Sequence, residues 1–194
     1  MIYFDKKQIE KRAPHELKHF LSLDIVNQDV ILAGGALRTI FKDDSKIVDF
    51  DLFFKDGLTP AKVSLQLEDL EFKNVFTCPK GELKTFKRDD IKVQLITKTY
   101  YRDMEHVIST FDINACCIAY DGTKIVTTRN AIRDIFRKSI TLNNVEYPNA
   151  TFRRILKYKD KGYKVTNKAI DRFVDVIYNN GVEQSAMSRV FYVD

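Results

Sequence analysis

Two stretches of the sequence decide the fold of this chain: DVILAGGALR at residues 29–38 and DFD at residues 49–51. In the first stretch an apolar run is followed by Gly34 and Gly35, which is typical of a buried strand that enters a tight turn. Residues 36–41 then have helical character. Residues 47–54 alternate in part, which predicts a second strand with both aspartates on one face. The pattern predicts a unit of strand, turn, helix and strand.

The two aspartates of the second strand are candidate metal ligands. Residues i and i+2 of a strand share a face, so the carboxylates of Asp49 and Asp51 point into the same space. Like charges this close repel each other, and a bound cation relieves that repulsion. Mg²⁺ prefers oxygen ligands, and two Mg²⁺ ions about 3.5–4 Å apart can clamp the phosphates of a nucleotide. The alternative is a pair of acids on an ordinary solvated strand.

The glycines and the arginine near this pair suit a bound phosphate. Gly34 and Gly35 at a strand-to-helix turn let backbone amides approach phosphate oxygens, and the helix N-terminus adds favourable dipole charge. Arg38 lies one helical turn beyond the glycines and is placed to reach a phosphate or a ribose. Without Asp49 and Asp51, the same glycines would indicate only a tight turn.

The remainder of the chain predicts an α+β fold. Helices are expected over residues 6–23 with a break at Pro14, over residues 59–70, and over most of the chain from residue 131 onward. Further strands are expected over residues 72–78, 83–87, 91–96, 115–120 and 124–127, the first three as an antiparallel meander. This order of helix, strands, helix, strands and helices is that of an α+β protein with a mixed or antiparallel sheet.

Composition and charge narrow the class of protein. Hydrophobic residues make up 44% of the chain, which is enough for a core and excludes a disordered chain. No apolar run approaches the ~20 residues of a membrane span, and adjacent Cys116 and Cys117 suit a reducing cytoplasm. Residues 123–172 hold 13 Lys and Arg against four Asp and Glu, although the net charge of the chain is only +5. This basic region indicates a phosphate-bearing partner, or else a solvated helical face.

The sequence resembles a known family at these motifs. Residues 34–38, GGALR, followed by the DFD of residues 49–51, resemble the head of the class II CCA-adding enzymes and bacterial poly(A) polymerases. Those enzymes belong to the DNA polymerase β-like nucleotidyltransferase superfamily, of which this chain resembles a short version of phage or mobile-element type. FDINA at residues 111–115 resembles a second family signature, Arg-Asp-Phe-Thr-Ile-Asn-Ala. The chain differs from the family pattern at Thr39 and at Ser109-Thr110.

The resemblance implies a third acid at the site. In the superfamily this acid lies on a later strand, where the present chain offers only Gln94. Asp112 is expected to supply the missing charge, and its alternative role is to cap a helix that begins near residue 113. We therefore expect Asp49, Asp51 and Asp112 to be the catalytic and metal-binding residues, with Gln94 as a weaker candidate.

The resemblance also implies a nucleotide-binding helix in the basic region. Arg154 and Lys157 are expected to bind the triphosphate or an edge of the base, and Tyr158 is expected to stack on the base. The alternative is a basic stripe on the surface of a helix. The expected division is a catalytic head over residues 1–128 and a helical, neck-like extension over residues 129–194, packed on the head.

The expected function is Mg²⁺-dependent transfer of a nucleoside monophosphate from an NTP, such as ATP, to an acceptor hydroxyl. Two Mg²⁺ ions are expected, and RNA, for example the 3′ end of a tRNA, is the expected acceptor through residues 123–172. One alternative is toxin-like or regulatory transfer to a protein or a small molecule. Another is a non-catalytic nucleotide- or RNA-binding module. The sequence predicts a cytoplasmic protein without a membrane partner, and it leaves the NTP, the acceptor and the oligomeric state open.

Overall fold

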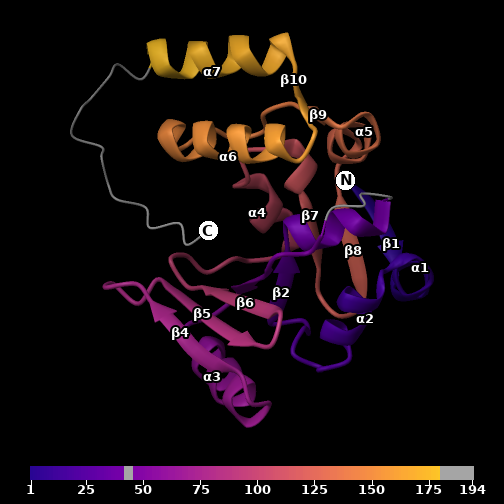
Figure 1. Cartoon of the computed structure of the whole chain (residues 1–194), viewed down its shortest axis with the longest axis vertical. Helices are drawn as coiled ribbons and strands as arrows, with labels where there is room; N and C mark the ends of the chain where they lie inside the picture. The colour runs from indigo at the N-terminus through magenta and orange to yellow at the C-terminus, as the bar shows by residue number, and fades with distance from the viewer. Residues whose placement is uncertain (42–45, 180–194) are drawn as a thin grey trace.

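The computed structural model describes residues 1–41 and 46–179, which form one mixed sheet with helices around it (Figure 1). The strands of the sheet are β1 (Ile2–Asp5), β2 (Val30–Ala33), β3 (Phe50–Phe54), β4 (Lys73–Thr77), β5 (Leu83–Arg88), β6 (Ile91–Ile96), β7 (Ile118–Tyr120) and β8 (Lys124–Thr127). Their order across the sheet is β1-β8-β7-β2-β3-β6-β5-β4. Within this sheet β3 and β6 pair in parallel, and the other described pairs are antiparallel.

Helices cover the sheet and extend beyond it. They are α1 (Lys6–Arg12), α2 (His15–Leu21), the 3-10 helix η1 (Gly35–Phe41), α3 (Thr59–Asp69), α4 (Met104–Ser109), the 3-10 helix η2 (Asn114–Cys116), α5 (Arg129–Arg137), α6 (Pro148–Asp160) and α7 (Asn167–Asn179). A separate parallel pair joins β9 (Ser139–Ile140) to β10 (Lys164–Val165). Figure 1 shows α6 and α7 side by side at one end of the molecule, and α3 beside β4 at the other. Among the described helices, none has the length and apolar character that a bilayer span requires.

The α+β prediction is confirmed, and several boundaries follow from local chemistry. Pro14 has an extended backbone and separates α1 from α2, because its ring cannot continue a helix. The meander of β4, β5 and β6 forms as expected. Pro60 lies in the first turn of α3, where its missing amide costs no hydrogen bond.

The structure differs from the sequence prediction in several of its elements or segments. The turn after Gly34 continues as a 3-10 helix, and residues 115–120 divide between η2 and β7. The helix α4 and the terminal strand β1 were not predicted. The expected helical extension also contains β9 and β10, and its last part, residues 180–194, lies outside the described residues.

The strand that carries the DFD motif is firmly held in the core. Phe50 stacks on Phe20 of α2 with ring centroids 4.0 Å apart, and Leu52 and Phe54 are fully buried. Burying each of these side chains contributes about 1.5–3 kcal/mol. Asp51 lies on the opposite face of the same strand, so this packing fixes the backbone from which its carboxylate projects.

Candidate active site

Asp51 is the centre of the site. It lies between β2 and β6, in register with Ala33 on one side and Gln94 on the other. The residue is half-buried, and its Oδ1 atom is fully buried without a hydrogen-bond partner. Burial first, and then the negative charge of Asp49, raise the pKa of Asp51 to about 8. A buried carboxylate oxygen without a partner, beside a second acid, fits a divalent cation with oxygen ligands.

Gly34 keeps the space beside this carboxylate open. Its φ of +91° lies in the left-handed region that favours glycine. A Cβ atom built there would lie 3.5 Å from Oδ2 of Asp51 and 3.8 Å from Cε2 of Phe111. The Gly34 amide donates to the carbonyl of Ile118 at 2.9 Å. The amide is therefore already engaged in the sheet, and phosphate binding at Gly34 and Gly35 stays a prediction.

Cationic side chains from two elements act on the acidic pair. The charges of Arg154 and Lys157, on α6, and of Lys92, on β6, oppose the rise in the pKa of Asp51. Arg154 and Lys157 were expected from the sequence. Lys92 was missed, although it lies two residues before Gln94 on the same strand and so shares its face.

Lys161, directly after α6, is a second cation that the sequence analysis missed. Burial, and then the positive charges of Arg38 and Lys157, lower the pKa of Lys161, whereas the charge of Asp49 raises it. Lys161 follows Lys157 by four residues, and this spacing on a helical turn was the available signal. β3 begins at Phe50 and not at residue 47 as predicted, so Asp49 directly precedes the strand and Asp51 lies on it. The site thus has an acidic side at the start of β3 and a basic side around α6.

Asp112 lies at the joint between the head and α6. Its Oδ2 atom accepts hydrogen bonds from Arg154 Nη1 at 2.6 Å and from Thr151 Oγ1 at 2.9 Å, and its Oδ1 atom accepts from the Ile113 amide at 2.9 Å. Nowhere in residues 1–41 and 46–179 do three His, Cys, Asp or Glu side chains gather closely enough to share a metal. The structure therefore does not bring Asp112 together with Asp49 and Asp51, and a metal role for Asp112 stays a prediction.

A row of unpartnered polar atoms runs across the sheet from Asp51. Asp51 is in register with Gln94 on β6, and Gln94 is in register with Thr85 on β5, so the three side chains share one face. Gln94 is 8% exposed and Thr85 is 1% exposed. In the described part of the chain, the buried side-chain N and O atoms without a partner are Asp51 Oδ1, Gln94 Nε2 and Thr85 Oγ1. All three belong to this row, which we call the polar row.

Arg38 occupies a different environment from the one expected. Its side chain is 2% exposed, and it donates to the Gly35 carbonyl at 3.2 Å and to the Tyr163 hydroxyl at 3.3 Å. The guanidinium carbon lies 4.8 Å from the ring centroid of Tyr158 and 5.7 Å from that of Tyr163. The Tyr158 hydroxyl lies 2.6 Å from Cys116 Sγ, and burial raises the pKa of Tyr158. Nucleotide contacts by Arg38 and Tyr158 stay predictions; in this structure both side chains join η1 to α6.

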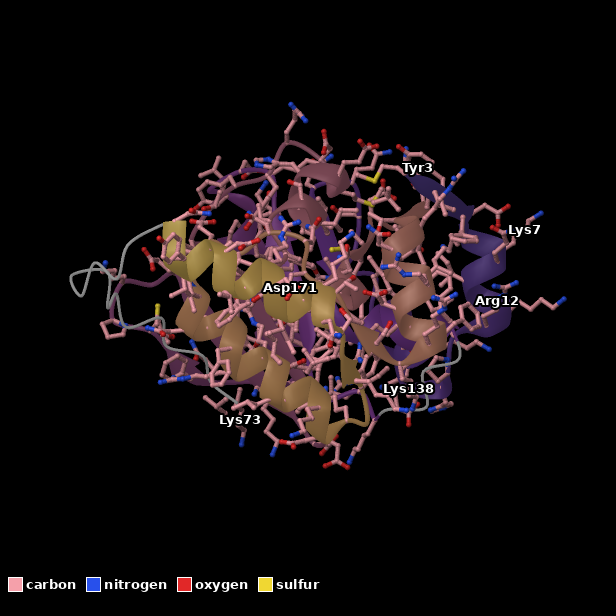
Figure 2. All side chains as sticks on the ribbon, turned by 90° about the horizontal axis from the view of Figure 1, so that it is seen from above. Tyr3, Lys7, Arg12, Lys73, Lys138 and Asp171 are labelled. Atoms are coloured by element: carbon pink, nitrogen blue, oxygen red, sulfur yellow. The ribbon has the colours of Figure 1, made fainter. Side chains whose placement is uncertain are left out.

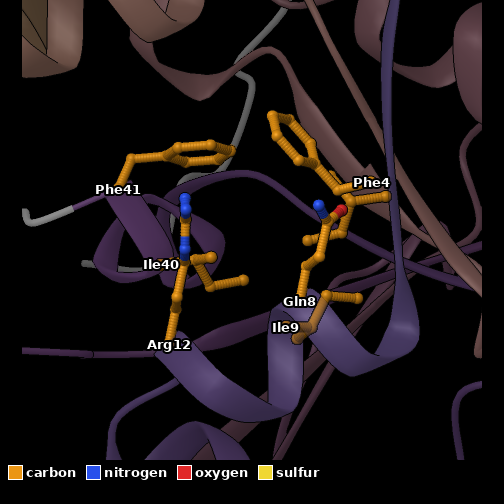
Figure 3. Close-up of a pocket in the computed structure, with 7 residues that line it drawn as sticks. Phe4, Gln8, Ile9, Arg12, Ile40 and Phe41 are labelled. Atoms are coloured by element: carbon orange, nitrogen blue, oxygen red, sulfur yellow. The ribbon is translucent and has the colours of Figure 1, made fainter.

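A pocket beside η1 lies apart from the acidic pair (Figure 3). It is lined by Phe4, Gln8, Ile9, Arg12, Ile40, Phe41 and Ile125. Its lining contains no acid, so it offers no counterpart to the acidic pair Asp49 and Asp51. Seen from above, Lys7 and Arg12 extend from α1 at the edge of the molecule, with Asp171 of α7 over its centre (Figure 2). The basic residues of α1 are therefore not part of the basic side of the site.

The fold is similar to that of one part of solved CCA-adding enzymes. A CCA-adding enzyme in its apo form superposes with a TM-score of 0.68 at 14% identity, over 95% of this chain and 48% of the enzyme. The Thermotoga maritima CCA-adding enzyme in complex with tRNA gives 0.67 at 12% identity, over 92% and 46%. A complex of CCA-adding enzyme with ATP gives 0.66 at 17% identity, over 95% and 48%. These similarities establish the fold.

The chain belongs to the Gabija anti-defense 2 family, whose sequence model matches residues 5–138. A curated relative, "Gabija anti-defense 2" of Bacillus phage SPbetaL7, is 26% identical over 175 residues, which is 88% of this chain and 42% of that protein. The relative comes from a phage, in agreement with the phage-type version expected from the sequence. The chain spans less than half the length of this relative and of the three solved enzymes described above.

Proposed function

We propose that this chain transfers a nucleoside monophosphate from an NTP to an acceptor hydroxyl, with Mg²⁺ held by Asp49 and Asp51. The observation that carries the proposal is the buried, unpartnered Oδ1 atom of Asp51, beside a second acid and the open space at Gly34. When bound there, Mg²⁺ would neutralise phosphate charge and support attack by the hydroxyl. Solved relatives of this fold include complexes with ATP and with CTP, which supports an NTP as the donor.

The basic side of the site suits the triphosphate. In the reaction, the acceptor oxygen forms a bond to the α-phosphorus and releases its proton to solvent water, and the bond from the α-phosphorus to the departing pyrophosphate breaks. Negative charge accumulates on the phosphate oxygens and the leaving group. Arg154, Lys157 and Lys161 lie close enough to the acidic pair to act on it, and in the proposed complex they hold and stabilise this charge. Asp112 orients Arg154 by accepting its hydrogen bond, and Thr151 donates to the same carboxylate oxygen.

RNA is the acceptor that the charge distribution favours. Residues 123–172 carry 13 Lys and Arg against four Asp and Glu, and they include α6. A structural relative has been solved in complex with tRNA. Binding that depends on this region weakens as the salt concentration rises, because phosphate contacts release counterions.

The family description favours a second candidate. An anti-defense role is compatible with transfer of the nucleotide to a component of a defence system, which would be a protein or a small molecule. In that case the chemistry at Asp49 and Asp51 stays the same, and only the acceptor differs.

Transfer of label tests the function and separates the two acceptors. The protein is incubated with Mg²⁺ and each α-³²P-labelled NTP, with total RNA in one arm and bacterial lysate treated with RNase in the other. We expect label on RNA, and a loss of at least about a thousandfold in Asp49→Asn/Asp51→Asn, because metal binding contributes several kcal/mol to such a transition state.

The matched control is Asp89→Asn/Asp90→Asn. Both residues are exposed, the charge change is identical, and Asn tolerates the positive φ of Asp89. This variant should transfer label like the wild type. Label confined to the RNase-treated arm would select the second candidate. Transfer that survives in the Asp49/Asp51 variant, or that never occurs, would contradict the proposed function.

A further inference from the structure

The acidic side of the site carries an unusually small negative charge for two divalent ions. Asp49 and Asp51 supply two carboxylates, and no third acid joins them among the described residues. Asp112 is committed to Arg154 and Thr151. We propose that this site binds one divalent cation, not two, and that basic side chains act on the triphosphate in place of a second ion. The inference rests on the proposed function and deepens it.

Gln94 makes the site neutral where a further ligand would lie. It is in register with Asp51 on the neighbouring strand and is 8% exposed. A carboxylate at this position would lose most of its hydration and would lie next to a second, half-buried carboxylate. The amide avoids both costs, because it is polar without being charged. As a result, β6, the strand next to β3, carries no negative charge at the position where a second cation would need one.

Thr85 continues this neutral character away from the metal. Its unpartnered Oγ1 atom extends the polar row from Gln94 to β5, so the positions in register with Asp51 on β6 and β5 offer an amide and a hydroxyl and no carboxylate. Mg²⁺ usually keeps several waters when it is bound by only one or two carboxylates. The Gln94 amide, in register with Asp51, is placed to hydrogen-bond such a water, whereas it cannot replace the charge of a missing ligand.

The cations around Asp51 disfavour a second ion directly. Arg154 and Lys157 from α6 and Lys92 from β6 all act electrostatically on Asp51. A second divalent ion beside the first would be repelled by these side chains as well as by its neighbour. The same three positive charges are placed to neutralise phosphate oxygens, which is the other task of a second ion.

Manganese binding measures the number of ions without relying on activity. Mn²⁺ replaces Mg²⁺ at oxygen sites, and an isolated Mn²⁺ gives a simple six-line EPR spectrum, whereas two ions about 3.5–4 Å apart are spin-coupled. Equilibrium dialysis counts bound Mn²⁺ per chain, without nucleotide and with a non-hydrolysable NTP analogue. For the wild type we expect one Mn²⁺ per chain and an uncoupled spectrum in both conditions.

Two variants that add a carboxylate should convert the site from one bound ion to two. Gln94→Glu keeps the size of the side chain and adds a carboxylate, so bound Mn²⁺ should rise from one to two per chain with a coupled spectrum. Lys92→Glu, on the same face and partly exposed, serves as the second variant if Gln94→Glu does not fold, and it should also raise the count. Thr85→Val is the matched control, which changes the polar row without adding charge and should keep one ion.

The outcomes separate this inference from the proposed function. A coupled pair of Mn²⁺ ions in the wild type would overturn the single-ion inference and leave the proposed function standing. An unchanged count in both folded acidic variants would also overturn it. No Mn²⁺ bound by the wild type beyond that of Asp49→Asn/Asp51→Asn would overturn the inference and the proposed function together.

Discussion

Arg38 and Asp51 are two ionisable side chains that are largely enclosed by the protein, and they differ in their hydrogen-bond partners. Arg38 donates to a carbonyl and to a tyrosine hydroxyl and lies near two aromatic rings. Asp51 has a buried oxygen without a partner and a second acid as its neighbour. A buried charge with partners stabilises the fold, whereas one without them indicates a ligand that is yet to bind. The comparison distinguishes a residue that holds the site together, Arg38, from a residue expected to bind a ligand, Asp51.

The largest difference between the two residues should appear in stability. Arg38→Met removes the donors to the part-buried Gly35 carbonyl and the buried Tyr163 hydroxyl, so the free energy of unfolding should fall by about 3 kcal/mol. Asp51→Asn removes a desolvated charge and should leave the free energy unchanged or raise it in metal-free buffer. Urea unfolding measures both. Arg12→Met, at an exposed position on α1, is the control and should change stability by less than about 0.5 kcal/mol.

A different result for Arg38 would break the comparison. If Arg38→Met unfolded like the wild type and yet lost NTP affinity, Arg38 would belong with the chemistry, as the GGALR motif predicted. Isothermal titration with a non-hydrolysable NTP gives that affinity.

The free energy of unfolding should depend on pH, because the carboxylate of Asp51 has a buried oxygen without a hydrogen-bond partner and a raised pKa. Its pKa is raised from the ordinary value of 3.8 to about 8 in the folded, metal-free chain, so the folded state holds a proton that the unfolded state has released. Stability should therefore decrease as the pH rises from 5.5 to 8, by about 2–3 kcal/mol at about 1.4 kcal/mol per pH unit. Urea unfolding in EDTA measures this slope. It should vanish in Asp51→Asn and flatten with Mg²⁺, and an equal slope in Asp51→Asn would contradict the assignment.

Asp112 provides a second comparison with Asp51, because it is a buried acid whose carboxylate accepts hydrogen bonds from Thr151 and Arg154. Asp112→Asn keeps the hydrogen bond with Thr151 and removes the charge that orients Arg154, whose side chain is one-third exposed. We expect a loss of about 1–2 kcal/mol in stability, and a rise in the KM for NTP that exceeds the change in kcat. Thr151→Val is the control and should affect stability alone. Loss of bound Mn²⁺ in Asp112→Asn would instead make Asp112 a metal ligand, as the family resemblance implied.

The sequence predicted the elements whose signals are local. The apolar run before Gly34, the proline break and the meander of β4, β5 and β6 were found because period and turn chemistry specify them. The strand β1 was missed because four alternating residues are specified by their partner β8, far away in the sequence. The 3-10 geometry of η1 also depends on packing that no local pattern records.

The site was predictable to the same extent. The spacing of Asp49 and Asp51 predicted that the two acids lie close together, and in the structure the charge of Asp49 acts on Asp51. Gln94, the expected counterpart on a later strand, is in register with Asp51. The environment of Arg38 was not predictable, because its partner Tyr163 lies 125 residues away and the contact exists only once the chain is folded. Thr85 joined the site only through the register of β5.

The order of the strands in the sheet also determines when each strand can pair during synthesis. β3, β4, β5 and β6 lie within residues 50–96, so the half of the sheet that carries the polar row forms from neighbouring sequence. β1 pairs with β8, and Ile2 is in register with Thr127. At about 5–20 residues per second, β1 waits roughly 6–25 s for β8 to be made. Until β8 is made, β1 is an unpaired strand, and unpaired strand edges are prone to aggregation.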